Sequence, residues 1–348
     1  MRKQFKKIQY FFLGTALLLV LPSCLDIYFT TEIKPNGEIT KTVVFEGDST
    51  EILNVYFPFI EDESWEREWI YIDKDKSKLI LSKTFKNAKQ AGLDLNPDDS
   101  IPMIRFQPEL KRKFRWFFSY FEYTDLMLAT NPFDKIDWRE YLTEDEVDLI
   151  PMDEEDRESD PRYIKADYET AEKRFEDYLL NSGFEEFFQL FIQALKNTNG
   201  ISLKEEDVVN QKQELFKIAV DADDNDSIEG ILASFFGVLD STDVNKIKVQ
   251  NVELLEYFDQ KLDFFEEVFD DNLHFTIRMP GLLISTNSNQ IEGNSLSWEV
   301  DSFDSFFKDY PMTAESRIIN IWAFVVAGLA VAILLFSLIW SVVRRKKS

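Results

Sequence analysis

Residues 25–47 read LDIYFTTEIKPNGEITKTVVFEG and predict how the folded part of this chain begins. Apolar and polar side chains alternate over 25–33, which is the pattern of a half-buried strand. The Pro-Asn-Gly sequence at 35–37 favours a turn, and a second alternating stretch covers 39–45. These residues therefore predict a β-hairpin.

Other stretches with strand character lie on both sides of a long central segment. Residues 114–121 are apolar on both alternating faces, so we expect one strand that is central in a sheet or covered by helices. The remaining predicted strands are 69–72, 78–85, 273–279, 282–285, 295–300 and 312–316. We expect the strands of 271–316 to join the sheet formed by 25–125.

The central segment, residues 143–270, has helical periodicity and many acidic residues. Thr143 and Glu146 have the spacing of a capping box, and further helices are predicted over 203–220 and 227–239. Two apolar stripes at helical spacing are Phe187, Phe188, Phe191, Ile192 and Leu195, and Leu255, Phe258, Leu262, Phe265 and Phe269. We expect this segment to dock on the sheet.

The C-terminal segment 318–343 has 26 residues without a formal charge. As a helix it would measure about 39 Å, more than the roughly 30 Å of bilayer hydrocarbon. Trp322 and Trp340 lie near its ends, as interfacial anchors do, and the chain closes on a basic tail, Arg344, Arg345, Lys346 and Lys347. The positive-inside rule predicts a cytoplasmic tail, and the alternative is a buried soluble helix.

The N-terminal segment 1–23 has a basic start and an apolar stretch, as secretory signals do. It ends in Leu21, Pro22 and Ser23, directly before Cys24, the only cysteine of the chain. This arrangement resembles the bacterial lipobox, which implies cleavage before Cys24 and acylation of its thiol and new amine. The alternative is an uncleaved signal anchor with an incidental cysteine.

Together these segments predict an α+β protein: an antiparallel β-rich extracytoplasmic domain with a helical insertion and one C-terminal transmembrane helix. The predicted parts are a signal peptide (1–23), an N-terminal β-rich part (24–142), the acidic helical insertion (143–270), C-terminal strands (271–317), the membrane helix (318–343) and a basic tail (344–348). Helical spans belong in an inner membrane, so the ectodomain would be periplasmic. If both anchors share that membrane, the first and last strands must begin and end on its side, with the helices further out.

Composition excludes several functions. There are 31 basic and 64 acidic residues between positions 24 and 343, a net charge of −33, which makes nucleic acid an unsuitable partner. There is no Gly-x-Gly for a phosphate loop, and a single histidine, His274, lies on the polar face of a predicted strand. Asp221, Asp223 and Asn225 match early EF-hand positions, but Asp226 replaces the required glycine, which favours a solvated loop. We therefore predict no catalytic residue, metal or cofactor.

The aromatic residues around 116–123 allow two interpretations. Trp116, Phe118 and Tyr120 could line a surface for an acyl chain or glycolipid. The alternative is that they pack in the core between sheet and helices.

Two parts of the chain resemble LppM-type bacterial lipoproteins. At one end, Cys24 precedes an alternating strand and the Asn36-Gly37 turn; at the other, Met279-Pro280-Gly281 is followed by a polar turn, Trp298 within a strand, and the membrane helix with its basic tail. The resemblance covers 24–125 and 271–347 and implies a lipid-tethered, β-rich domain that binds lipid or glycolipid at the cell envelope. The helical segment 143–270 departs from this pattern and looks like an insertion.

The function expected from these features is non-enzymatic. The extracytoplasmic domain would bind or scaffold an envelope component, whether lipid, glycolipid or protein, and membrane lipid would contact residues 318–343 and the acyl groups on Cys24. The alternative is an envelope hydrolase that uses a pair of carboxylates.

Overall fold

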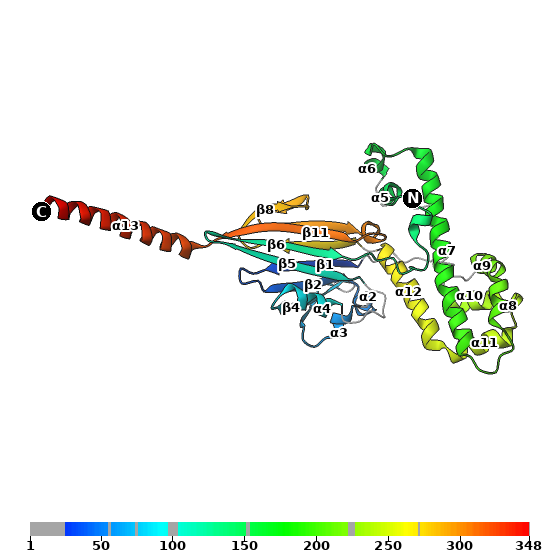
Figure 1. The fold of residues 1–348 in the computed structure, drawn as a ribbon. Coiled ribbons are helices and arrows are strands. Elements are labelled where there is room, and N and C mark those ends of the chain that lie inside the picture. Colours follow the sequence, from blue (N-terminus) through cyan, green and yellow to red (C-terminus); the bar gives the residue numbers. More distant parts are fainter. Residues whose placement is uncertain are drawn as a thin grey trace.

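The computed structural model describes residues 25–54, 57–73, 76–96, 104–150, 154–221, 227–270 and 272–347. In these residues the strands form two β-sheets, and a group of helices lies apart from one long C-terminal helix (Figure 1). The predicted α+β class is confirmed.

The first sheet has the strand order β3-β4-β2-β1-β7-β10-β9. Its strands are β1 (Asp26–Ile33), β2 (Ile39–Gly47), β3 (Glu66–Tyr71), β4 (Ser77–Phe85), β7 (Asn272–Arg278), β9 (Gln290–Glu292) and β10 (Ser295–Asp301). The predicted N-terminal hairpin is confirmed, since β1 and β2 pair antiparallel with Ile33 opposite Ile39. β7 pairs parallel with β1, so the segment after 271 does join the N-terminal strands, but the expected single sheet is two sheets, and β8 and β11 belong to the second.

The second sheet has the order β5-β6-β11-β8. Its strands are β5 (Phe106–Arg115), β6 (Phe118–Met127), β8 (Leu282–Thr286) and β11 (Tyr310–Ile319). The predicted single strand over 114–121 is wrong, because the chain turns at Trp116-Phe117 and Arg115 pairs with Phe118. The turn lacks glycine, proline, asparagine and aspartate, so composition gives no sign of it.

The two sheets share one apolar core. The inner faces of β1, β2, β6 and β7 contribute alternate side chains to it. The ring centroid of Phe29 lies 5.0 Å from that of Phe275 and 5.2 Å from that of Phe106, so the core joins both sheets. Short helices α2 (Ser49–Asn54), α3 (Pro58–Glu61) and α4 (Ala88–Leu95) contribute residues to the same core.

Apart from α13, the remaining helices share a core of their own. They are η1 (Trp138–Glu140), α5 (Glu144–Leu149), α6 (Glu154–Ser159), α7 (Lys165–Asn197), α8 (Glu205–Asn210), α9 (Lys212–Val220), α10 (Ile228–Ser234), η2 (Phe235–Gly237), α11 (Ser241–Gln250), α12 (Val252–Asp270) and η3 (Ser302–Ser305). We refer to the segment from η1 to α12 as the helical lobe.

The sequence predicted that the helical lobe docks on the sheet, and this prediction is wrong. It lies at one end of the sheets, and α13 (Ile321–Lys347) extends from the other (Figure 1). The apolar stripes of α7 and α12 pack against each other and against α10 and α11, so they need no sheet to bury them. The helix predicted over 203–220 is interrupted at Gln211, which separates α8 from α9.

The start of β1 and the end of β11 lie at opposite ends of the sheets. Because β1 and β7 are parallel, Ile27 lies beside Leu273, near the end of α12. At the other end of β7, a Cβ on Gly281 would lie 2.4 Å from the carbonyl oxygen of Arg317. At about 3.3 Å per residue, Leu25 and Arg317 are separated by on the order of 30 Å. The expectation that both strands face one membrane is therefore wrong.

Candidate functional site at the junction of the sheets and the C-terminal helix

α13 follows the second sheet without a linker. The strand β11 continues through Ile319, so the first two residues of the predicted membrane segment 318–343 belong to a strand. The part of α13 that is long and apolar enough to cross a membrane is Ile321–Trp340, and its side chains are almost all exposed. Trp322 lies near one end of this stretch and Trp340 at the other.

Asn320, the residue between strand and helix, is bonded to the β5–β6 turn. Its backbone N–H donates to the carbonyl of Phe117 (2.9 Å), and its side-chain amide donates to the carbonyl of Trp116 (2.9 Å). The hydroxyl of Ser119 donates to the Asn320 Oδ1 (3.1 Å). Asn320 is itself buried, so these bonds fix the turn against the first residues of α13.

Aromatic rings surround this junction. The Trp322 ring stacks on Phe114, with centroids 6.1 Å apart, and meets Trp116 edge-on at 5.5 Å. The ring centroid of Phe324 lies 4.6 Å from that of Phe117. The structure thus assembles an aromatic cluster from a hairpin turn and the start of a helix that lies some 200 positions later in the sequence.

The three residues predicted to form an apolar ligand surface lie on the β5–β6 turn and on β6. Trp116 is in the turn and is 51% exposed, whereas Phe118 and Tyr120 lie on β6 and are half-buried. Phe118 contacts Phe324 and the guanidinium of Arg317. None of the three is fully buried, as the core interpretation requires, and the apolar ligand surface stays a prediction.

Other predicted site residues can be placed only in part. Leu21, Pro22, Ser23 and Cys24 lie outside the described residues, and so do the residues after Asp221 in the EF-hand-like loop. α13 continues through Arg344, Arg345, Lys346 and Lys347 as one helix. The His274 ring stacks on Tyr28, with centroids 4.7 Å apart.

A buried ion pair between the sheets was not predicted. Lys41 on β2 pairs with Asp125 on β6, and both side chains are almost fully buried. Asp125 also accepts hydrogen bonds from the hydroxyls of Tyr123 (3.0 Å) and Thr31 (3.4 Å). Burial, and then the neighbouring Asp125 charge, raise the pKa of Tyr123 well above its ordinary value. The one sign of this pair in the sequence is Lys41, which occupies an inward position between Ile39 and Val43 on β2.

The helical lobe contains a second buried ion pair. Lys261 on α12 binds Glu186 on α7 (2.7 Å) and donates to the carbonyl of Pro132 (2.9 Å). Such a pair favours one arrangement of the two long helices, because a misplaced helix would leave a buried charge without its partner.

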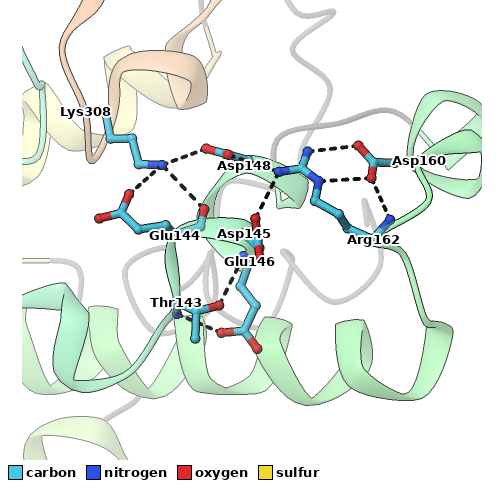
Figure 2. Close-up of polar contacts among 8 residues, drawn as sticks. All are labelled: Thr143, Glu144, Asp145, Glu146, Asp148, Asp160, Arg162 and Lys308. Carbon is cyan, nitrogen blue, oxygen red and sulfur yellow. Dashed lines mark hydrogen bonds and ion pairs between the residues drawn. The ribbon is translucent and has the colours of Figure 1, made fainter.

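A surface network fastens α5 to the segment before β11 (Figure 2). Lys308 binds Glu144 and Asp148, each at 2.7 Å. The Arg162 guanidinium makes two hydrogen bonds to Asp160 (2.8 and 3.0 Å) and its backbone N–H makes a third (2.8 Å), and these bonds lower the pKa of that carboxyl from 3.8 to about 2. The predicted capping box is confirmed: Thr143 and Glu146 bond each other's backbone.

The carboxylates of the described residues form no metal site. No group of three or more His, Cys, Asp or Glu side chains gathers there as metal ligands would. An open groove of about 300 Å³ on the outer face of the second sheet contains Glu122 and Glu315, directly opposite each other on β6 and β11. Glu122 pairs with Lys113, and Glu315 accepts from Ser285 at 3.4 Å.

Comparison with known proteins gives one distant similarity. No family model and no curated protein sequence matches the chain. Among solved structures, the chain is similar to the NMR structure of the folded domain of the Mycobacterium tuberculosis LppM protein. The sequence identity is 8% and the TM-score 0.28, over 88% of this chain and 97% of that chain. The resemblance to LppM-type proteins stays a prediction from the sequence, and this similarity assigns no role to any residue.

Proposed function

We propose that this protein is a membrane-anchored, non-enzymatic binding or scaffolding protein of the bacterial envelope. α13 crosses the inner membrane with its basic tail in the cytoplasm. The sheets stand on the periplasmic surface and carry the helical lobe away from it. The lobe would bind an envelope component, whether lipid, glycolipid or protein.

The observation that carries this proposal is the bonded junction at Asn320. A membrane helix joined by a flexible linker would leave the domain free to take any orientation. Here the helix begins one residue after β11, and three hydrogen bonds tie that residue to a neighbouring hairpin. The helical lobe lies at the far end of the sheets from α13 (Figure 1), so an upright domain presents the lobe at its outer end.

The proposal treats acylation of Cys24 as a separate prediction. Cys24 is bonded to Leu25, which is buried at the lobe end of the sheets. An acyl chain attached there reaches the bilayer of α13 only if the long axis of the domain lies along the membrane. Acylation and the upright orientation are therefore alternatives within one membrane.

Hydrolysis is the weaker candidate. The carboxylates of Glu122 and Glu315 lie opposite each other, but Glu122 is neutralised by Lys113 and the groove is open. A glycosidase needs one of its two carboxyl groups protonated and enclosed near the substrate.

Mass spectrometry of the native protein and of whatever co-purifies with it tests the proposal. The variant Val249→Asp with Val252→Asp alters the exposed surface of the lobe. We expect this variant to lose a co-purifying ligand or partner, while α13 remains embedded in the membrane. The matched control is Leu93→Asp, an exposed residue on α4. Retention of every co-purifying component by the lobe variant would contradict a binding role for the lobe.

A further inference from the structure

The tip of the β5–β6 hairpin exposes large apolar side chains in spite of its ordered contacts. Phe114 is 58% exposed and Trp116 is 51% exposed, and Leu282 on β8, opposite Arg317 of β11, is exposed at the same end of the sheet. A water-facing patch of this kind next to a membrane helix is unusual in a folded domain, because its burial would be favourable.

The same hairpin is basic, unlike the rest of the ectodomain. Lys111, Arg112, Lys113 and Arg115 lie on β5, and no acidic residue occurs between 111 and 121, although Lys111 and Lys113 also pair with the flanking Glu109 and Glu122. Arg317 on β11 adds a charge at the same end of the sheet, beside Phe118. The local charge is thus opposite in sign to the overall charge of −25.

Geometry places the hairpin tip at the level where α13 enters the bilayer. The span Ile321–Trp340 has 20 residues, or about 30 Å of helix, which matches the hydrocarbon thickness. Trp322 and Phe324, in the first turn of this span, contact Phe114, Trp116 and Phe117. The tip rings therefore lie beside the first turn of the span, where the interfacial region begins.

We propose that the β5–β6 hairpin is a second membrane-binding element: its aromatic tip inserts into the bilayer interface, and its basic residues bind anionic lipid headgroups. The occupant of this surface is the anionic lipid of the bilayer that α13 crosses, and this inference rests on that crossing. Aromatic rings favour the interfacial region, and basic residues near it are attracted to anionic phosphates. The hairpin would hold the domain upright, because helix and tip give two points of contact with the membrane.

The test uses the full chain with Cys24→Ala, in nanodiscs of phosphatidylcholine with phosphatidylglycerol. Single cysteines replace Phe117, Leu334 or Val249 and carry an environment-sensitive fluorophore. We expect a label at 117 to be quenched by a lipid-borne quencher and protected several-fold from aqueous iodide, compared with a label at 249 in the lobe. A label at 117 that behaves like the label at 249 overturns the inference if the label at 334 is protected. Iodide access at 334 would contradict the membrane crossing itself.

The charge contribution is tested in the same nanodiscs. Energy transfer from the label at 117 to fluorescent phosphatidylglycerol should exceed transfer to fluorescent phosphatidylcholine, and Lys113→Gln with Arg115→Gln should abolish this excess. Lys86→Gln with Lys89→Gln, which removes the same charge near α4, should leave it unchanged. An excess that survives the hairpin substitutions, or that the control removes equally, overturns the role of the basic residues.

Discussion

Charged residues at inward positions show what single residues contribute to this fold. Lys41 and Asp125 occupy positions where alternation predicts apolar side chains, and each compensates the other across the two sheets. Sequence periodicity shows that Lys41 is out of phase, but it cannot identify the partner, because Asp125 lies 84 positions away. The glycines are similar: Gly281 is visible in the sequence, whereas the carbonyl that requires it is supplied by β11.

Replacing one member of the buried pair should be costly. We expect Lys41→Met to lower the free energy of unfolding by about 3–5 kcal/mol, because Asp125 remains buried without a counter-charge. The double change Lys41→Met with Asp125→Leu should recover most of that loss. Denaturant titration of the full chain in detergent measures both. Lys78→Met, which removes a half-exposed partner of Glu46, should cost less than about 1 kcal/mol. Equal losses of unfolding free energy in Lys41→Met and Lys78→Met would refute the buried ion pair between Lys41 and Asp125.

Substitutions at two glycines with positive φ can distinguish backbone strain from steric conflict. Gly293→Ala (φ 66°) has open space around the new Cβ and should cost only about 1–2 kcal/mol. Gly281→Ala (φ 79°) has similar strain but places its Cβ 2.4 Å from the Arg317 carbonyl oxygen, so β8 and β11 must separate. We expect a clearly larger loss for Gly281→Ala in thermal unfolding. Indistinguishable midpoints would show that the close approach of the two segments does not exist.

The Arg162 pair should be visible in a titration. The pKa of Asp160 is about 2 in the folded protein against an ordinary value of 3.8, so the folded state binds this proton less readily. The stabilisation that the ionised Asp160 carboxylate provides is present above pH 3.8 and is lost as the pH falls towards 2. NMR titration of the Asp160 carboxyl should give this low midpoint, and Arg162→Gln should raise it towards 3.8. Asp62, whose pKa of about 2 depends on Ser64 and Lys83, is the internal control and should not move.

At the scale of elements, alternation and helical periodicity predicted most strands and helices but not how they meet. The N-terminal hairpin followed from pattern, and so did the return of 273–279 to the N-terminal strands, but the parallel pairing with β1 did not. The turn at Trp116-Phe117 did not, because an aromatic pair in a hairpin turn has the same composition as a buried strand. Nor could the stripes of α7 and α12 show that they would bury each other instead of covering a sheet.

The junction at Asn320 yields an element-level prediction. Asn320→Ala removes the side-chain bonds to Trp116 and Ser119 and leaves the backbone bond to Phe117. We expect α13 to stay embedded while amide hydrogen exchange accelerates in the β5–β6 turn. Ser337→Ala removes only a bond to the carbonyl of Leu334 within α13, so the turn should exchange at the original rate. Unchanged exchange in Asn320→Ala would mean that the turn is held by its own strands alone.

At the scale of the whole molecule, the arrangement of the ends decides the orientation. The sequence predicted two anchors at one edge of the domain, but the parallel β1–β7 pair places the start of β1 at the lobe end. Parallel pairing of strands that are about 245 positions apart leaves no local trace in the sequence. The proposed arrangement is therefore an upright domain, held by α13 and presenting the helical lobe away from the bilayer.

The most direct test of this account measures the height of two residues above the membrane. Donor fluorophores are placed at Leu282→Cys, beside Arg317, or at Val249→Cys on α11, in the full chain with Cys24→Ala. Acceptor lipids mark the surface of the nanodisc. The account predicts strong energy transfer from position 282 and much weaker transfer from position 249. Equal transfer from both positions would mean that the domain lies along the membrane, and it would contradict the account.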